Sequence, residues 1–593
     1  MTHTQFKRVA RSRISKFAVS AAIVTMFWGC QSPLSSHFNT ANLKNIQHLL
    51  GEDVHVEDGL SVSVQGIPKD IEPALIGRMD ELDAITPVGI DGTWPSQITT
   101  PINGESLSTT GITIDQAVLW AIKNNLDLKL SRLEPAISKQ SYIQADSVFD
   151  FVFAGTASSR GVKIPQQQTL VGGIQFGASE SVSDVLAYEA SLAKKLTSGG
   201  TFTVASTVTK TDSETSGLTF NPNPSWQSIG TLDFKQPLLR GFGEKVALSE
   251  VKLAKNANAK SIQEFKHALH VLVTDTEKAY LQLALQWRIL QVQEWLLEQG
   301  ESVVEILELR RDYDTSESDY AQAVATVKQR SADVIYQQAE VQNASDQLKL
   351  LMNNPTLAIE TTTVLCPKGD IKVEDIHLSL RDTILTAAAN RPDLQSLRIS
   401  VDNQNIKVNV AKNATLPQLD LQAQLSFYGL DSGAGNAYSE VFNGEYINHL
   451  IGLSFEQPLD NRFAKAGYRS SRLQRVAAIT TYNKAVQQVI LEVKTAMRKV
   501  ATNAALVSAN KSFRIAQAEN LRALGVEEDT LTGLTPTFLN LKLQTQAGLA
   551  NARIAEFTSA VNFNSALASL YLASGTTLEM HQIIFDDAVA LEY

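Results

Sequence analysis

Few residues of this chain have the types and spacing that chemistry requires, and the best set lies on a predicted helix. His267 and His270 stand three positions apart and follow Glu264 by about one turn, so together they could bind a metal ion. A di-metal helical bundle needs a second set of this kind, and the sequence offers none. The other histidines are scattered, and no candidate nucleophile stands in a catalytic motif. We therefore predict no metal site, no cofactor and no enzymatic activity.

Cys30 is the other residue with possible chemistry, because it follows a typical export signal. Residues 1–29 carry five basic and no acidic side chains, and they end in an apolar run that begins at Phe17. A small residue followed by cysteine resembles a bacterial lipobox, in which the cysteine becomes the lipid-bearing N-terminus. Ordinary signal cleavage that leaves Cys30 unmodified is the alternative. Gln31 in place of aspartate after the cysteine favours delivery to an outer membrane.

Composition limits the function classes. Charged residues make up 19% and hydrophobic residues 44% of the 593 positions, which suits a folded protein. The net charge of −10 argues against nucleic-acid binding. The only other cysteine is Cys366, so acylation of Cys30 leaves no disulfide within the chain. Packing and assembly must then supply the stability of this exported protein.

The chain contains a long internal duplication, in which residues around 112–352 are echoed by residues around 378–572. The opening helices of the two copies are 266 positions apart, whereas their Gln-Pro pairs are 221 apart. The first copy therefore holds about 45 extra residues, the difference between these offsets. A repeat this long is no solenoid unit. We predict a signal peptide (1–29), an N-terminal extension (30–110), a first repeat (111–372) and a second repeat (373–593).

Alternating apolar and polar residues predict strands in both repeats. In the second repeat, for example, Leu419, Leu421 and Leu425 alternate with polar side chains. At about ten residues each, such strands can cross a bilayer when tilted, although a soluble sandwich shows the same alternation. The extra residues include a hairpin at Ser198-Gly199-Gly200, and the sequence leaves open whether it joins the other strands. The predicted strands lie near 148–158, 185–210, 226–236, 416–428 and 448–457.

Each repeat continues into a long helix and a shorter returning helix. The long helices are predicted at 244–311 and 463–529, and the returning helices at 318–352 and 537–572. Ile262, Phe265 and Leu269 follow the heptad spacing of a coiled coil. At a rise of ~1.5 Å per residue, each long helix measures ~100 Å. A globular core has no room for such helices, so we expect a strand layer followed by a long helical layer.

These features resemble the TolC-like outer-membrane efflux proteins over residues of about 112–575. The most specific piece is the junction between strand and long helix, where proline ends the strand ladder and glycines permit a tight turn. Its residues are Gln236, Pro237, Leu238, Gly241 and Gly243 in the first repeat, and Gln457 and Pro458 in the second. The resemblance implies a mainly α protein with a β-barrel part, in which outer-membrane strands join a long α-helical coiled-coil tunnel. It also implies a homotrimer in which each chain gives four strands to a twelve-strand barrel.

The turns between the long and returning helices are the expected working ends. Members of the family meet a periplasmic adaptor at these tips and close the tunnel there. The acidic side chains could form charged rings at a constriction, or they could simply be solvated helix ends. The tip residues are Asp312, Asp314, Ser316 and Asp319 in the first repeat, and Gly533, Leu534 and Thr535 in the second.

The resemblance implies an exit duct of a tripartite efflux or type I secretion system, passively conducting substrates from an inner-membrane pump to the exterior. The partners would be a periplasmic adaptor, a pump of RND, ABC or MFS type, and outer-membrane lipid, with no nucleic acid. The strands would lie in the bacterial outer membrane and the helical part in the periplasm. A lipid-anchored periplasmic coiled-coil scaffold without a pore is the alternative, and a secreted adhesin or stalk is a weaker one.

Overall fold

The computed structural model describes most of the two repeats, and all described residues belong to one compact unit, residues 60–593. The expected signal peptide and Cys30 lie outside the described residues, as does most of the N-terminal extension. The described residues are 60–62, 75, 77–85, 97–99, 106–165, 167, 169–172, 174–176, 180–215, 220–312, 315–369, 371, 373, 375–530 and 535–585.

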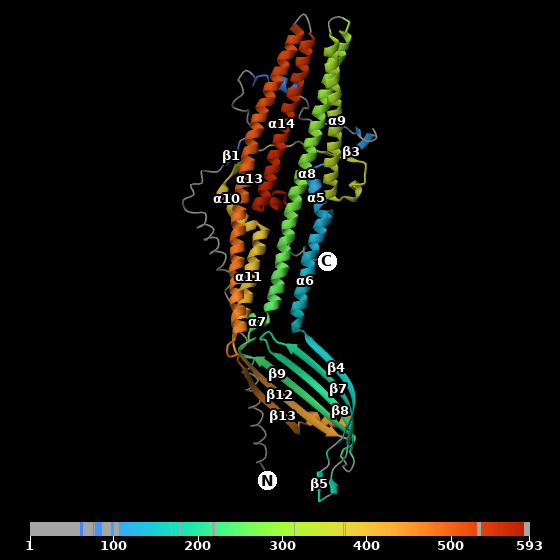
Figure 1. Cartoon of the computed structure of the whole chain (residues 1–593), viewed down its shortest axis with the longest axis vertical. Coiled ribbons are helices and arrows are strands. Elements are labelled where there is room, and N and C mark those ends of the chain that lie inside the picture. The colour runs from blue at the N-terminus through green and yellow to red at the C-terminus, as the bar shows by residue number, and fades with distance from the viewer. Residues whose placement is uncertain are drawn as a thin grey trace, which may run out of the picture. The chain divides into compact units, whose positions relative to one another are not determined.

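One large antiparallel sheet forms the strand layer (Figure 1). Within the described residues it has six strands, in the order β13-β12-β9-β8-β7-β4. The four strands per chain that the family resemblance implies are therefore too few, because the extra hairpin of the first repeat pairs inside the sheet. The strands are β4 (Phe151–Pro165), β7 (Glu180–Lys195), β8 (Thr201–Thr215), β9 (Ser225–Pro237), β12 (Gln418–Asp431) and β13 (Tyr446–Glu456).

The pairing register gives this sheet one apolar and one polar face. Ala423 of β12 pairs with Phe234 on one side and with Ile451 on the other, and Phe234 pairs in turn with Phe202. The next position along β12, Gln424, pairs with Asp233. Since neighbouring positions along a strand point to opposite faces, the apolar rows lie together on one side and the polar rows on the other.

Long helices continue from the sheet (Figure 1). In the first repeat they are α5 (Ile114–Asn124), α6 (Leu126–Asp146), α7 (Glu244–Ala247), α8 (Ser249–Leu309) and α9 (Glu317–Met352). In the second they are α10 (Leu380–Asn390), α11 (Pro392–Asn413), α13 (Arg462–Thr530) and α14 (Pro536–Ser574). At ~1.5 Å per residue, the 61 residues of α8 and the 69 of α13 span ~90 and ~100 Å. No helix in the described part of the chain is both long and apolar enough to cross a membrane.

The helix predicted at 244–311 is wrong in one respect, because it is interrupted at Leu248. The chain makes one turn, α7, before Leu248 donates its N–H to the carbonyls of Glu244 and Val246. The hydroxyl of Ser249 then donates to the Val246 carbonyl at 2.7 Å, and α8 begins. These bonds satisfy the groups that a break in a helix exposes, so the interruption costs little.

Smaller elements complete the described chain. They are β1 (Leu60–Val62), α4 (Met79–Ile85), β2 (Gln97–Thr99), β3 (Ser106–Ile112), η1 (Ser147–Phe149), β5 (Thr169–Val171), β6 (Ile174–Phe176), η2 (Pro355–Leu357), β10 (Val364–Pro367), β11 (Ile376–Leu378), α12 (Ala434–Asn443) and α15 (Thr577–Met580). β10 pairs in parallel with β3, and β3 pairs with β2, to make a small sheet beside the helices.

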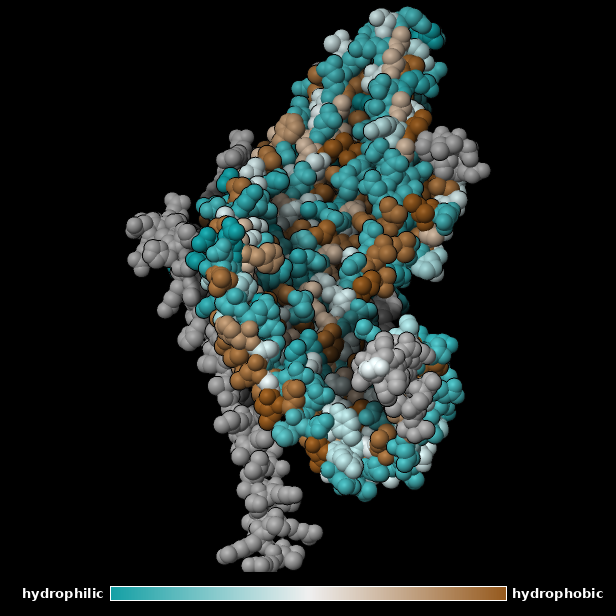
Figure 2. Space-filling view, turned by 60° about the horizontal axis from the view of Figure 1, so that its bottom comes forward, coloured by the Kyte–Doolittle hydropathy of each residue, from teal (hydrophilic) through white to brown (hydrophobic). Residues whose placement is uncertain are grey.

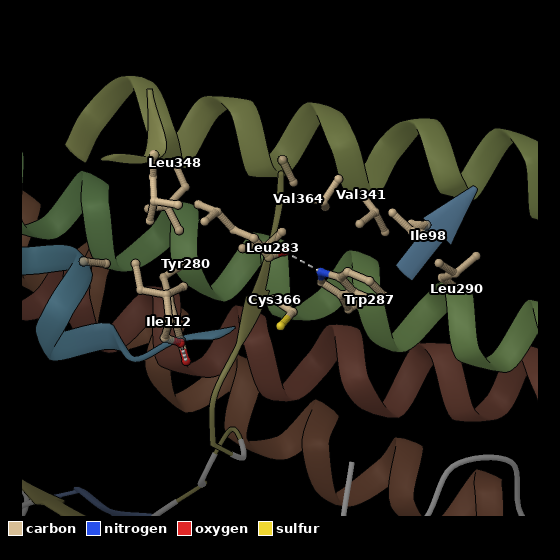
Figure 3. Close-up of a cluster of buried hydrophobic side chains, with 14 of the residues drawn as sticks. Ile98, Ile112, Tyr280, Leu283, Trp287, Leu290, Val341, Leu348, Val364 and Cys366 are labelled. Carbon is tan, nitrogen blue, oxygen red and sulfur yellow. Dashed lines mark hydrogen bonds between the residues drawn. The ribbon is translucent and has the colours of Figure 1, made fainter. Parts of the chain in front are cut away.

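A large core cluster of described residues lies where α8, α9 and this small sheet meet (Figure 3). Trp287 of α8 is fully buried, and its indole N–H donates to the carbonyl of Leu365 at 2.8 Å. The hydroxyl of Tyr280 lies 3.0 Å from the carbonyl of Lys368. Burial raises the pKa of Tyr280 to about 12, so this hydroxyl stays protonated. The polar tips of both aromatic side chains are thus paired, and they fix the linker between the repeats to α8.

The N-terminal extension packs on the second repeat through α4. Leu82 is fully buried against Ile515 of α13 and Leu549 of α14. At the next position, a carboxylate oxygen of Asp83 lies 2.6 Å from the guanidinium of Arg514, which is itself 3.0 Å from Glu556. This short helix therefore contacts both α13 and α14.

His270 gives the helical layer a sensitivity to acid. Its ring is 2% exposed on α8, and neither ring nitrogen has a hydrogen-bond partner among the described residues. Burial, with the nearby positive groups of Lys266 and His267, lowers its pKa from 6.5 to about 4. Below pH 6.5 the unfolded chain therefore binds more protons than the folded chain, and stability falls as the pH drops toward 4. By linkage, the loss at pH 5 is about 2 kcal/mol per chain.

We expect His270→Leu to abolish most of this acid sensitivity, because an apolar side chain has no proton to gain. The measurement is the difference in unfolding midpoint between pH 7.5 and pH 5. His267→Leu is the matched control and should keep most of the wild-type difference, because His267 is the smallest of the three causes that lower the pKa of His270. An unchanged pH dependence in His270→Leu would show that another group is responsible.

Candidate functional site

The strand-to-helix junction of the first repeat is built around Gln236, near the end of β9. Its side-chain oxygen accepts a hydrogen bond from the hydroxyl of Ser198 at 2.7 Å. Its side-chain N–H₂ donates to the carbonyls of Ser198 at 3.2 Å and of Pro237 at 2.9 Å. Ser198 lies in the turn between β7 and β8, so this glutamine ties the extra hairpin to the junction. The sequence alone gave no sign of this partner.

The glycines of the junction allow close backbone approach. Gly241 and Gly243 have φ of 87° and 93°, which side-chain-bearing residues rarely adopt. The N–H of Gly241 donates to the side chain of Asn413 at 2.7 Å, and the N–H of Gly243 donates to the carbonyl of Ser198 at 2.9 Å. Asn413 is the last residue of α11. The junction loop thus joins the hairpin turn of the first repeat to the helix that leads into β12.

Strand β9 ends at Pro237, but backbone hydrogen bonds to the second repeat continue past the proline. Leu238 donates its N–H to the carbonyl of Leu419 at 2.7 Å, and Arg240 donates to the carbonyl of Pro417 at 3.2 Å. Arg240 contacts the side chain of Gln418, and its guanidinium lies 3.9 Å from the carboxylate of Glu456 on β13. The first-repeat junction therefore reaches across both strands of the second repeat.

The second-repeat junction shares the contact between glutamine and proline with the first, but its glutamine has one side-chain oxygen without a partner among the described residues. The side-chain N–H₂ of Gln457 donates to the carbonyl of Pro458 at 2.9 Å, the same contact that Gln236 makes with Pro237. The side-chain oxygen of Gln457 has no partner among the described residues. Asn461, with φ of 44°, takes the left-handed position and donates to the carbonyl of Thr415 at 2.8 Å. Gln457 follows β13, which is an edge strand among the described residues.

The tip residues are only partly described, because Asp314, Gly533 and Leu534 lie outside the described residues. Ser316 caps α9 by accepting from the N–H of Asp319 at 3.1 Å, and Thr535 caps α14 in the same way. Asp312 is exposed at the end of the first hairpin. Two of the predicted residues therefore act as helix caps, a role that fits solvated helix ends as well as a docking surface.

The two helical hairpins contact each other close to these tips, on the side toward the sheet. Leu539 is fully buried in a cluster with Leu307 of α8 and Ala323 of α9. The ion pair between Arg311 and Glu317, at 2.7 Å, lies on the exposed surface and contributes little stability. The apolar contacts thus do most to hold the hairpins together near their ends.

Arg330 is a site residue that the sequence reasoning missed. It is 4% exposed, and its guanidinium donates to the carbonyl of Leu296 on α8 at 2.7 Å and to that of Leu543 on α14 at 2.8 Å. Gly300 leaves the space, because a Cβ there would lie 2.7 Å from the guanidinium. Arg330 shares the inward heptad row of Ala323 and Val334, and a charge in such a row was the available signal.

We expect Arg330→Met to weaken the link between the two hairpins without unfolding the chain. Burial lowers the pKa of Arg330 to about 10. The buried charge therefore costs about 3 kcal/mol, which offsets the hydrogen bonds that methionine would lose. The unfolding midpoint should stay near that of the wild type, while hydrogen exchange of the α9 and α14 backbone around Arg330 becomes faster. Glu294→Gln, on α8, is the control and should leave these exchange rates unchanged. Wild-type exchange rates in Arg330→Met would contradict this role.

Proteins of known structure share this architecture. Residues 383–576 match the family model described as outer membrane efflux protein. The CmeC outer membrane channel of Campylobacter jejuni is 16% identical with a TM-score of 0.56, over 85% of this chain and 99% of that one. The open-state MtrE channel of Neisseria gonorrhoeae is also 16% identical, with a TM-score of 0.54 over 83% and 97%. No curated protein sequence matches. The chain therefore shares the fold of these channels over almost their full length.

Proposed function

Because this chain carries an outer membrane efflux protein domain and has the fold of the outer-membrane channels, we propose that it is the exit duct of a tripartite efflux or type I secretion system. Three copies would enclose the passage, and an inner-membrane pump would supply the energy. The observation that supports this proposal most directly is the sheet, which has one apolar face, one polar face and two long edges that pair on one side only among the described residues, and which helices of ~100 Å continue. A scaffold without a pore has no use for such a sheet.

The faces of the sheet suit a wall between lipid and water. Strands of 11 to 16 residues are long enough to cross the hydrocarbon layer when tilted. The apolar rows that include Phe234 and Ile451 would face lipid, and the polar rows that include Asp233 and Gln424 would face the lumen. A single curved sheet cannot close around a lumen, so the wall requires further copies.

Both edges of the sheet are available to other copies. β4 and β13 are exposed along almost their whole lengths, and each pairs on one side only among the described residues. Because the strands alternate in direction, β13 of one copy meets β4 of the next in antiparallel orientation. The two edges can therefore close into a ring by ordinary strand pairing.

The edges of the helical layer are also available to other copies, because they expose apolar side chains. On α6, Leu126, Leu130 and Ile137 are all about 60% exposed and follow coiled-coil spacing. At the other edge, Leu473 and Val476 of α13 are 70% and 55% exposed. Figure 2 shows apolar patches of this kind between polar areas of the surface. We propose that α6 of one copy packs on α13 of the next, directly after the β4–β13 pair on the helical side of the sheet.

The remaining assignments complete the proposal. The signal peptide 1–29 would export the chain, and acylated Cys30 would anchor it in the outer membrane. The tips would dock on a periplasmic adaptor, with Asp312 and Asp319 at the contact. A pump of RND, ABC or MFS type would complete the assembly.

A planar-bilayer recording of the purified protein separates the duct from the scaffold. The duct gives stable single-channel currents, and a poreless scaffold gives none. The adaptor contact is tested by a photo-crosslinker at Asp312, with Lys260 of α8, far from the tips, as the control position. Absence of channels from correctly folded trimers would exclude the duct.

A further inference from the structure

We infer that the assembled barrel has eighteen strands and is as wide as the helical tunnel that continues from it. This inference rests on the proposed trimeric duct and concerns the extra hairpin, β7–β8. The family pattern of four strands per chain predicts twelve. Six strands per chain in the described sheet give eighteen.

The hairpin is an integral part of the sheet. β7 pairs with β4 from Glu180 opposite Pro165 to Lys194 opposite Phe151, the whole length of β4. β8 pairs with β9 along most of that strand, up to Thr201 opposite Lys235. β4 and β9 are therefore separated by two full strands. A hairpin lying outside the wall would leave them in contact with each other.

The turn of the hairpin reaches the level at which the helices begin. Ser198 is bonded to Gln236 and to the N–H of Gly243, the residue before α7. A Cβ on Gly199 would lie 2.3 Å from the carbonyl oxygen of Gly241, which shows how closely the turn and the junction approach. The junction motif thus anchors the hairpin to the helical layer, although no helix continues from β7 or β8.

The widths of the two layers agree only when the hairpin is counted. In each chain α6, α8, α11 and α13 lie side by side next to the sheet. Four helices at about 10 Å spacing cover about 40 Å of wall. Strands at about 4.8 Å spacing and about 40° tilt cover about 6 Å each, so six cover about 38 Å and four only about 25 Å.

An eighteen-strand barrel therefore continues the tunnel without narrowing. Since barrel diameter grows roughly in proportion to strand number, it is about 1.5 times as wide as a twelve-strand barrel. The outer end of the duct would then admit any cargo that the tunnel admits. Selection by size would fall to the tips rather than to the barrel.

The repeat also gives the register in which neighbouring copies close the ring. Asp420 of β12 pairs with Pro237 at the end of β9. The two repeats are offset by 266 positions at β12 and by 221 at β9, so the equivalent of Asp420 is Ala154 of β4 and the equivalent of Pro237 is Pro458, after β13. If Pro458 of one copy lies opposite Ala154 of the next, antiparallel pairing places Leu453 opposite Ser159. In this register Gln457 lies opposite Gly155, within β4 of the next copy.

Polymer exclusion measures the width directly. Polyethylene glycols of graded size, added only on the outer side of a planar bilayer, lower the channel current when they enter the barrel. A variant lacking residues 180–215 pairs β4 with β9 and forms twelve strands, so its cutoff diameter should fall by about one third. Equal cutoffs for the two proteins overturn the inference and leave the duct intact. Absence of current in the wild type overturns the duct itself.

A disulfide test keeps the inference falsifiable if the shortened chain does not fold. On a Cys366→Ser background, Val204→Cys with Leu232→Cys joins residues that pair directly between β8 and β9. This pair should cross-link in outer membranes. Thr203→Cys with Leu232→Cys is the control, because its side chains point to opposite faces of the sheet. Failure of the first pair, or equal cross-linking of both, overturns the strand order on which the count depends.

Discussion

Leu453→Arg should remove most of the protein from the outer membrane. Leu453 lies on the apolar face of β13 and pairs with Leu421; it is 66% exposed in the single chain. An arginine facing lipid costs about 2–4 kcal/mol at the bilayer midplane and about 0–1 kcal/mol near the interface, and Leu453, three residues from the end of β13, lies between the two. The proposed trimer carries three copies, so a cost of about 1–3 kcal/mol per copy sums to about 3–9 kcal/mol. The measurement is the amount of trimer in outer-membrane fractions relative to wild type.

The neighbouring residue provides a matched control for this prediction. Ser454 pairs with Asp420 on the polar face, so Ser454→Arg adds the same charge toward the lumen. This variant should assemble normally, and its channels should become more selective for anions. If both variants assembled equally well, or if only Ser454→Arg were lost, the assignment of the two faces would be wrong.

Gly199→Ala should destabilise the junction far more than Gly243→Ala. Both glycines have φ of 93°, so both substitutions incur the same backbone strain, about 1–2 kcal/mol. A Cβ on Gly243 meets nothing within 4 Å, whereas one on Gly199 would lie 2.3 Å from the carbonyl oxygen of Gly241. Pushing the hairpin turn off the junction adds about 1–3 kcal/mol.

The measurement for this pair is the temperature at which the purified trimers unfold. Gly243→Ala should lower it slightly, and Gly199→Ala by at least twice as much. Because backbone strain is common to both variants, their difference reports the contact between the turn and the junction. Equal shifts would mean that the turn moves away freely and does not help to hold the sheet to the helices.

The elements of the fold could be predicted from the sequence because their signals are local. Heptad spacing such as that of Ile262, Phe265 and Leu269 extends over many turns, and alternation in segments such as 418–428 extends over a whole strand. Because of the duplication, most of these patterns occur twice in the chain. The predicted resemblance to the outer-membrane efflux proteins is confirmed by the match of residues 383–576 and by the shared fold.

Long-range pairing is what the sequence could not supply. The extra residues and their turn were visible, but an ordered list of strands does not state which strands are neighbours. The partners of Gln236 and Gly241 are Ser198 and Asn413, which lie 38 and 172 positions away. The buried contacts of Arg330 with α8 and α14 depend in the same way on how the hairpins pack.

The alternating direction of the strands has a consequence for how such ducts diversify. The chain enters the sheet on β4 moving away from the helices and leaves on β9 moving toward them, so anything inserted between them must comprise an even number of strands. With the proposed three copies around the ring, the number of strands at the outer aperture can grow or shrink only in steps of six. Evolution could thus change the bore of the exit through one loop, while the coiled coil and its periplasmic end stay untouched.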